Sequence, residues 1–225
     1  MSSRQRHRGQ HSNDPRLFSE KWIPVLNEAV EDYSWLISRG YSDDASLKLV
    51  GDRYRLDERQ RRALARAGCT DEARQTRRIR RMEAEGLRGR RLVIDGYNLL
   101  ITVESALAGG IVLDCRDDCY RDIASVHGTY RDVEETQPAL TMIGISLQKL
   151  EVEHVFWLLD SPVSNSGRLK LLMLDISRQY NFDWKIELSA NPDRKIAGME
   201  DVVAITSDSW VLDHSKTWFN MHRHV

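Results

Sequence analysis

The sequence predicts an α/β fold with a central, mostly parallel sheet in a three-layer sandwich, preceded by a small all-helical domain. Short apolar runs that end in an aspartate and lead into helix-like stretches indicate strands alternating with helices. Apolar residues spaced three and four apart from Leu17 to Gly40 indicate the helical part. We therefore expect a disordered tail at 1–15, a basic helical domain with a linker helix at 16–88, and an α/β domain at 89–225.

Composition and charge limit the class of protein. The chain has 225 residues, of which 41% are hydrophobic and 30% charged, as in a soluble globular protein. No apolar run approaches the roughly 18 residues of a membrane span, and the N-terminus lacks the apolar core of a signal peptide. We expect a cytoplasmic protein with no membrane partner and three ordinary thiols, and the sequence leaves a homodimer open.

The charge is divided between the two halves of the chain. Residues 1–91 carry 21 Lys and Arg against 14 Asp and Glu, a net charge of +7, whereas residues 92–225 carry a net charge of −8. A basic half suits RNA or another nucleic acid, and an acidic half suits a metal ion. Two halves that only attract each other would show the same division.

The helical half has clear start and stop signals. Ser42 and Asp57 are placed to cap two helices, and Gly68 ends the second of them. A helix, a tight turn and an Arg-rich helix resemble a helix-turn-helix, although a small bundle with a solvated basic face fits equally. Residues 71–91 predict a charged linker helix or a strip that contacts nucleic acid. The arginines that we expect to contact nucleic acid are Arg61, Arg62, Arg78 and Arg81.

In the α/β half, the run LVID ends at Asp95 and is followed by a helix. Four more strands are expected, at residues 111–113, 154–160, 184–188 and 202–205, and a final one at 217–221. The polar segment 114–127 predicts a loop and a short helix, and a long helix starts near Thr129. Pro138 should kink or interrupt that helix, and Asn191 to Asp193 should form a turn. His222 and His224 alternate, so they could share one face of the last strand.

Three of the predicted strands end in an aspartate, and these residues form the candidate site. The sequence LVID ends in Asp95, FWLLD in Asp160 and AITSD in Asp208. Parallel strands bring their carboxyl ends to one edge of the sheet, so the three carboxylates could converge there. Such a cluster suits Mg²⁺ or Mn²⁺, which could activate water for phosphodiester hydrolysis. Asn98 can reach the same space, although Asp95 and Asn98 could instead simply cap the next helix.

A second group lies after the strand that ends in Asp160. Ser164, Asn165, Ser166 and Arg168, with Gly167, stand at a predicted helix start. Backbone N–H groups there could bind a phosphate, and Arg168 could add a bidentate contact. An ordinary helix cap with a solvated arginine explains the same residues.

Two stretches resemble a known nuclease superfamily. VIDGYNLL resembles the opening motif of the NYN branch of the PIN-like nucleases, and VVAITSDSWVLD is similar to the closing motif. The resemblance implies a PIN-like fold that cleaves RNA with a divalent metal. It also implies that Asp95 and Asp208 are principal ligands, with Asn98 and Asp160 in support. Those nucleases offer a further acidic residue from a middle helix, for which the candidates are Glu104, Asp117, Glu134 and Glu135.

Most of residues 20–225 also resembles an uncharacterised prokaryotic family, domain of unknown function 434, through YSDDASLKLVGDRYRLDERQRRAL and VSNSGR. That family carries no assigned activity. From the strand-end aspartates and the resemblance to nucleases, we expect a hydrolase, namely a metal-dependent ribonuclease or a related phosphodiesterase. The alternatives are a non-catalytic nucleic-acid-binding or regulatory protein, and a small-nucleotide hydrolase or binder that uses Ser164 to Arg168.

Overall fold

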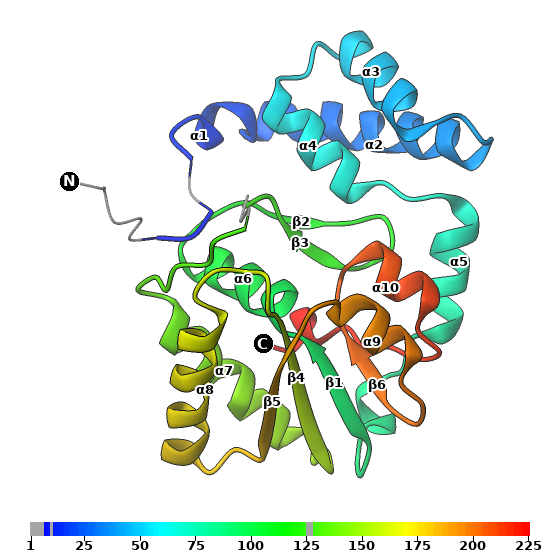
Figure 1. Cartoon of the computed structure of the whole chain (residues 1–225). Helices are drawn as coiled ribbons and strands as arrows, with labels where there is room; N and C mark the ends of the chain where they lie inside the picture. Colours follow the sequence, from blue (N-terminus) through cyan, green and yellow to red (C-terminus); the bar gives the residue numbers. More distant parts are fainter. Residues whose placement is uncertain (1–6, 10, 125–127) are drawn as a thin grey trace.

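The computed structural model describes residues 7–9, 11–124 and 128–225, and it has the predicted mixed α/β architecture with a helical N-terminal region (Figure 1). Four parallel strands form the central sheet in the order β5-β4-β1-β6. Their bounds are Arg91–Asp95 for β1, His154–Asp160 for β4, Trp184–Ser189 for β5 and Val203–Ile205 for β6. The parallel sheet expected from the apolar runs is confirmed.

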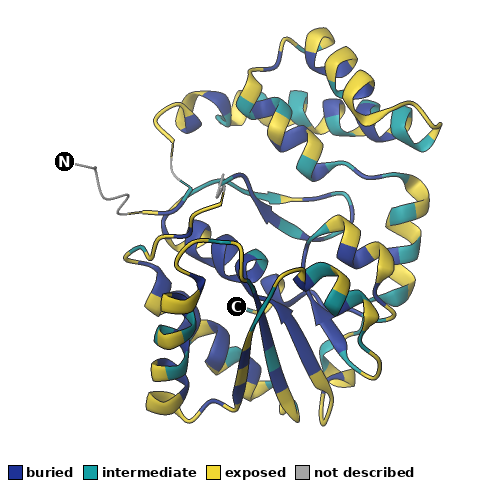
Figure 2. Ribbon diagram, in the orientation of Figure 1, coloured by how far each residue is buried: buried dark blue, intermediate teal, exposed yellow. Residues whose placement is uncertain are grey.

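Helices cover both faces of this sheet, which explains why Leu92 to Ile94 of β1 and all of β6 are apolar and buried (Figure 2). The outer strand β5 instead alternates buried and more exposed residues. One face packs on α6 (Gly96–Leu107), α7 (Thr136–Lys149) and α8 (Ser166–Tyr180). The opposite face carries Val93, Leu158 and Ala204, and it packs on α9 (Pro192–Gly198) and α10 (Ser209–His214). The candidate site lies on this second face, where the strands end.

The helical region is a small bundle. Its helices are α2 (Ile23–Ser38), α3 (Asp43–Arg53), α4 (Glu58–Ala67) and α5 (Asp71–Arg80), preceded by a short α1 (Asp14–Leu17) and a 3-10 turn at Glu20–Trp22. Ser42 caps α3 and Asp57 caps α4, as predicted. The first three of the longer helices share an apolar core that includes Ala29, Val50 and Leu64. The bundle lies beyond the carboxyl ends of the strands, with a β-hairpin between it and the sheet (Figure 1).

That hairpin corrects one prediction. Residues 114–127 were expected to form a loop and a short helix, but Val112–Asp114 (β2) and Tyr120–Asp122 (β3) pair as antiparallel strands. The segment between them reaches the bundle, where the Arg116 N–H donates to the Ala67 carbonyl at 2.9 Å. Residues 125–127 of the predicted helix lie outside the described residues. The hairpin therefore connects the bundle to the sheet edge.

Two helix predictions are also corrected. The long helix starts at Thr136 rather than near Thr129, so Pro138 lies in its first turn, where proline costs no hydrogen bond and causes no kink. The expected turn at Asn191 is a helix start, because the Asn191 side chain accepts from the Arg194 N–H and caps α9. A short 3-10 turn at Ala84–Gly86 precedes β1.

The two ends of the chain differ from expectation as well. Instead of a strand at 217–221, Trp218 makes isolated bridges to Arg81 and Ala204, and Met221–Arg223 is a 3-10 turn that buries His222. Part of the expected disordered tail is folded into the molecule. Arg8 is buried, and its Nε donates to the Glu104 carboxylate at 2.7 Å. No helix within the described residues has the length and apolar character to cross a bilayer.

Candidate functional site

The register of the sheet places Asp95 and Asp160 on the same face. Asp95, the last residue of β1, is paired with Leu158 of β4, and Asp160 lies two residues further along β4. Paired residues of parallel strands share a face, and so do residues two apart in one strand. Both carboxylates therefore lie on the face that α9 and α10 cover, at its carboxyl edge.

Asp95 is followed by a helix that starts without any turn residues. A Cβ atom on Gly96 would lie 2.9 Å from the Leu158 carbonyl oxygen and 2.5 Å from a Leu159 methyl carbon, so only glycine fits where α6 starts against β4. Asp95 occupies the N-cap position of α6, but its side chain makes no capping hydrogen bond. It accepts instead from the Thr206 hydroxyl, at 3.0 Å. The simple helix-cap interpretation of Asp95 is therefore wrong.

Asp208 reaches the same edge from the segment after β6. Its Oδ1 accepts from the Val211 N–H at 3.0 Å, so Asp208 caps α10 while its second carboxylate oxygen makes no protein hydrogen bond in the described structure. The Asn98 Oδ1 accepts from both the N–H and the hydroxyl of Ser207, at 2.7 and 3.0 Å. Asn98 therefore holds the segment that carries Asp208, and its amide oxygen is directed at Ser207 rather than at an open position.

A fourth carboxylate joins the three predicted from strand ends. Asp193 lies in the first turn of α9, a helix that contacts both β1 and β4. The charges of Asp208 and Asp160 both act on Asp193, which is half-buried. Its signal in the sequence was weak, because Asn-Pro-Asp after a strand is also ordinary turn chemistry. The capping bond of Asn191 shows that the motif starts a helix instead.

The four residues Asp95, Asp160, Asp193 and Asp208 are called the acidic edge below. Burial, together with the charges of Asp193, Asp208 and Asp160, raises the pKa of Asp95 to about 8 against the opposing effect of the hydrogen bond from Thr206. Burial also raises the pKa of Asp160, and burial together with the charges of Asp208 and Asp160 raises that of Asp193. No arginine, lysine or histidine that the structure describes forms an ion pair with these four side chains.

The acidic edge has the donor chemistry of a hard cation. Carboxylate oxygens are the ligands that Mg²⁺ and Mn²⁺ prefer, and a buried carboxylate without a cationic neighbour is one that such an ion would neutralise. Within residues 7–9, 11–124 and 128–225, however, no three His, Cys, Asp or Glu side chains form a preformed ligand set. The residues fit a divalent ion by the chemistry of their oxygen ligands and by their lack of cationic neighbours in the described structure.

Tyr97 is a neighbour of the acidic edge that the sequence did not single out. Its ring is buried against Tyr130, with 5.2 Å between centroids, and its hydroxyl has no hydrogen-bond partner in the described structure. Burial and the charge of Asp160 raise its pKa above the ordinary value, so the phenol stays protonated. It is a hydrogen-bond donor within electrostatic reach of Asp160.

The predicted phosphate loop at the start of α8 is largely engaged in holding the fold. The N–H groups of Ser164 and Ser166 donate to the carbonyls of Gly128 and Val163, at 3.0 and 3.2 Å. Asn165 has a positive φ of 71° and donates from its side chain to the Tyr130 carbonyl. Only Arg168 remains an exposed cation there, with no ion-pair partner in the described structure.

The arginines predicted to contact nucleic acid are mostly paired. Arg61 donates to Asp52 at 2.8 Å, and Arg62 to Glu58 at 3.2 Å. Arg81 forms ion pairs with Asp118 and Glu83. Arg78 is exposed and has no side-chain partner among the described residues, so it alone of the four is an unpaired surface cation.

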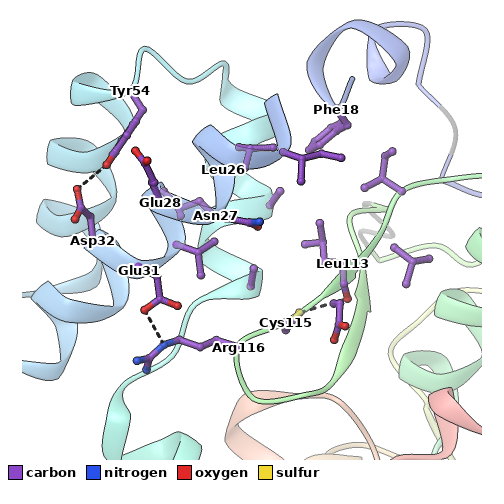
Figure 3. Close-up of a pocket in the computed structure, with 18 of the residues that line it drawn as sticks. Phe18, Leu26, Asn27, Glu28, Glu31, Asp32, Tyr54, Leu113, Cys115 and Arg116 are labelled. Carbon is purple, nitrogen blue, oxygen red and sulfur yellow. Dashed lines mark hydrogen bonds and ion pairs between the residues drawn. The ribbon is translucent and has the colours of Figure 1, made fainter. Parts of the chain in front are cut away.

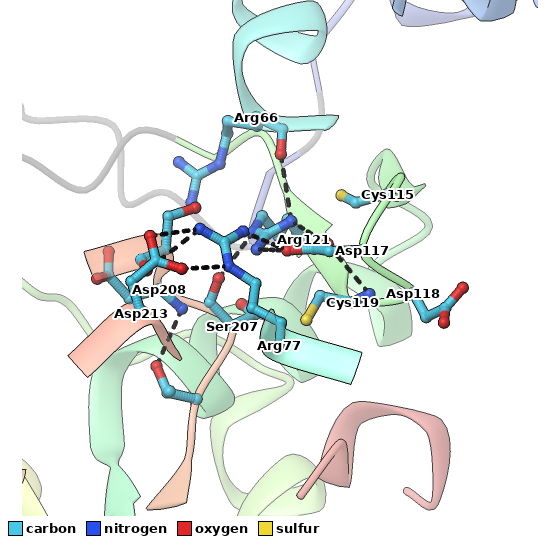
Figure 4. A network of polar contacts seen from close by, with 12 residues as sticks. Arg66, Arg77, Cys115, Asp117, Asp118, Cys119, Arg121, Ser207, Asp208 and Asp213 are labelled. Atoms are coloured by element: carbon cyan, nitrogen blue, oxygen red, sulfur yellow. Dashed lines mark hydrogen bonds and ion pairs between the residues drawn. The ribbon is translucent and has the colours of Figure 1, made fainter. Parts of the chain in front are cut away.

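Three of the four candidates for a further acidic residue form hydrogen bonds or ion pairs elsewhere in the fold. Glu104 is fully buried with Arg8, Tyr130 and Thr136, and the Glu135 carboxylate lies 2.6 Å from a ring nitrogen of His7. Asp117 is held between Arg77 and Arg121 (Figure 4). Asp193, which is not among these candidates, is the further carboxylate on which the charges of Asp208 and Asp160 act.

A large groove of the described structure lies away from the acidic edge. A groove of about 1160 Å³ lies between the helical bundle and the hairpin, with Leu26 and Leu113 on opposite walls (Figure 3). Two of its charged lining residues, Glu31 and Arg116, form an ion pair at 3.7 Å. None of the predicted site residues lines it, so the carboxylates, and not the size of the hollow, define the candidate site.

Comparison with protein families assigns the chain. Residues 84–224 match the family described as domain of unknown function 5616. The chain belongs to this family. Residues 25–80 match the protein family of unknown function 434, which therefore covers the helical bundle and not most of the chain as expected. The two matches divide the chain near the end of α5.

One curated relative is similar over most of the chain, and its name gives no activity. An uncharacterized protein of Methanocaldococcus jannaschii is 28% identical over 187 residues, which cover 83% of this chain and 88% of the relative. No solved structure matches the chain.

Proposed function

We propose that the protein is a divalent-metal-dependent ribonuclease or related phosphodiesterase, with a PIN/NYN-like fold in its α/β domain. The observation that carries the proposal is the acidic edge, in which four aspartates from four segments meet where parallel strands end. Like charges gathered in this way destabilise a fold, and proteins commonly retain such clusters where a cation or a reaction requires them.

Asp95, Asp160, Asp193 and Asp208 would hold Mg²⁺ or Mn²⁺. Bound there, the ion would supply Lewis-acid stabilisation of a phosphodiester and would lower the pKa of water. The chain itself supplies the rest of the chemistry. Asn98 holds the segment of Asp208 by accepting a hydrogen bond from Ser207, and the Thr206 hydroxyl donates to Asp95. Tyr97 offers a protonated hydroxyl within electrostatic reach of Asp160.

Two exposed cations next to the acidic edge favour a polyanionic substrate. Arg168 lies in the first turn of α8, after the strand that ends in Asp160, and Arg194 is the neighbour of Asp193 in α9. Neither side chain has an ion-pair partner in the described structure. Exposed arginines in the helices that follow β4 and β5 suit a nucleic-acid strand better than a neutral substrate.

The test is cleavage of single-stranded RNA by the full chain with Mg²⁺ or Mn²⁺, comparing the wild type with Asp95→Asn and Asp208→Asn. Asp175→Asn is the matched control, since this exposed carboxylate lies on α8 far from its first turn. We expect both edge variants to lose at least about hundredfold in rate, because removing a metal ligand removes the ion's contribution to the barrier.

The control should cleave as the wild type does. Equal cleavage by all four proteins would show a contaminating nuclease and would contradict the proposal. Salt-sensitive RNA binding without cleavage, unchanged in the edge variants, would favour the non-catalytic alternative. Competition by mononucleotides but not by RNA would favour a small-nucleotide site.

A further inference from the structure

Two buried arginines bind the backbone carbonyls of Ser207 and Ser209, the residues on either side of Asp208 (Figure 4). The Arg121 Nε donates to the Ser207 carbonyl at 2.7 Å, and an Arg77 terminal nitrogen donates to the Ser209 carbonyl at 3.3 Å. The peptide group that precedes Asp208 and the peptide group that follows Ser209 are therefore held by side chains from outside this segment.

Asp117 joins the two arginines to each other. It accepts two hydrogen bonds from Arg121, at 2.7 and 2.8 Å, and one from Arg77 at 2.6 Å. The other side of Arg77 is held by both oxygens of Asp213, at 2.7 and 2.8 Å. The side chains of Arg77, Asp117 and Arg121 are at most 5% exposed, so this is a dry, charge-balanced network.

The network joins parts of the chain that match two different families. Arg77 comes from α5, at the end of the helical bundle, whereas Asp117, Arg121 and Asp213 come from the α/β domain. The Arg77 carbonyl also accepts from the indole N–H of Trp218, at 2.7 Å, which fixes the backbone of α5 as well. The bundle thus supplies one of the two arginines that hold the Asp208 segment.

Stability alone does not explain this arrangement. Buried ion pairs often add little net stability compared with apolar packing, because their desolvation offsets their attraction. What they do provide is fixed geometry, since each bidentate arginine fits only one arrangement of acceptors. Here the acceptors include the backbone carbonyls of Ser207 and Ser209, the residues on either side of Asp208.

We propose that Arg77 and Arg121 are positioning residues for Asp208, and that the helical bundle, through Arg77, holds the acidic edge in order. The part of this inference that concerns cation binding and cleavage rests on the proposed function. The part that concerns the order of the Asp208 segment does not, and it is tested separately.

The experiment compares Arg121→Lys and Arg77→Lys in the full chain with a matched control, Arg59→Lys. Arg59 also makes a partly buried bidentate contact, to Asp14 at 2.5 and 2.9 Å, but it does not touch residues 207–209. Three quantities are measured: thermal unfolding, Mn²⁺ affinity by electron paramagnetic resonance, and hydrogen–deuterium exchange of peptides that cover residues 203–212.

We expect both network variants to raise exchange in residues 203–212 and to weaken Mn²⁺ binding by about tenfold or more, as loss of an outer partner of a metal ligand does. Arg59→Lys should leave both quantities at the wild-type value even where it lowers the unfolding temperature as much. If Arg77→Lys does not fold, Asp213→Asn releases Arg77 from one side at a position that is 39% exposed.

Equal changes of exchange in the control and network variants would mean that the network only stabilises the fold, and would overturn the inference. Unchanged exchange in all variants would overturn it as well. A wild type that neither binds Mn²⁺ nor cleaves RNA would contradict the proposed function, and the exchange data would then decide the inference by themselves.

Discussion

The acidic edge and the arginine network contain two buried aspartates with opposite environments. Asp95 lies among three other carboxylates, and burial with their charges raises its pKa to about 8. Asp117 is equally buried, which by itself would raise its pKa, but the hydrogen bonds and charges of Arg121 and Arg77 lower it to about 2. Burial is common to both sites, so the neighbouring charges decide whether the pKa of the carboxylate is raised or lowered.

The comparison also assigns a different role to each region. The network is balanced, with two arginines against Asp117 and Asp213, and it needs no further ligand. The acidic edge is unbalanced within the described structure, and a cation would complete it. Functional sites commonly combine unbalanced buried charge at one place with balanced ion pairs elsewhere in the fold.

The largest expected loss of stability follows from removal of the network's central charge. Asp117→Asn should lower the free energy of unfolding by about 3–5 kcal/mol, because it leaves two buried guanidinium groups without their shared partner. Urea unfolding monitored by circular dichroism measures this. Asp114→Asn is the control, since its pair with Arg223 is exposed and should contribute no more than about 1 kcal/mol. Equal losses would contradict the contrast between the network and ordinary surface pairs.

The next effect is the dependence of stability on pH at the acidic edge. The folded pKa of Asp95, about 8, lies above its unfolded value, so its stabilising contribution is complete below about pH 4 and is lost as pH rises to 8. Asp95→Asn removes this loss. Between pH 4 and 8 the free energy of unfolding should therefore rise in the variant relative to the wild type. The rise should be roughly 1.4 kcal/mol for each pH unit that separates the two pKa values.

Asp117 has the opposite sign in the same titration. Its folded pKa of about 2 lies below the unfolded value, so its contribution is complete above about pH 4 and is lost as pH falls toward 2. Urea unfolding of the wild type, Asp95→Asn and Asp117→Asn at pH 3 to 9 checks both signs. A constant difference between the wild type and Asp95→Asn across this range would contradict the raised pKa of Asp95.

A cation should remove the imbalance of the acidic edge. Mn²⁺ at about 100 times its dissociation constant should stabilise the wild type by about 2.7 kcal/mol, by mass action. The stabilisation should grow from pH 6 to 8, because the ion displaces the proton held by Asp95. Thermal unfolding with and without Mn²⁺ measures it. Asp95→Asn and Asp208→Asn should lose the effect and Asp175→Asn should keep it, whereas an equal gain in all four would indicate nonspecific binding.

The smallest expected effect concerns Asn98, which connects the two regions. Asn98→Ala removes two hydrogen bonds to Ser207 and should cost about 1–2 kcal/mol of unfolding free energy. Exchange of residues 203–212 should increase as it does in Arg121→Lys, since both changes release Ser207. Unchanged exchange would show that the arginines hold this segment without help from Asn98.

The sequence by itself determined the local features of this protein. Apolar runs bounded by Asp and Gly predicted the parallel strands, because strands covered on both faces must be apolar along their length. Ser42 and Asp57 predicted the starts of α3 and α4, because capping depends on residues three positions away. The strand-end aspartates predicted where the candidate site lies, since parallel topology brings the strand ends to one edge of the sheet.

The tertiary structure decided which charges have partners. Arg77 and Arg61 look alike in sequence as arginines of basic helices, yet Arg77 is buried between two aspartates more than 35 residues away, and Arg61 pairs at the surface. The sequence offered Asp117 as a further acidic residue of the site and placed Asp193 in a turn, because the surroundings of a carboxylate depend on charges from distant segments. Long-range electrostatics is set by the packing of elements, and neither spacing nor periodicity along the chain encodes it.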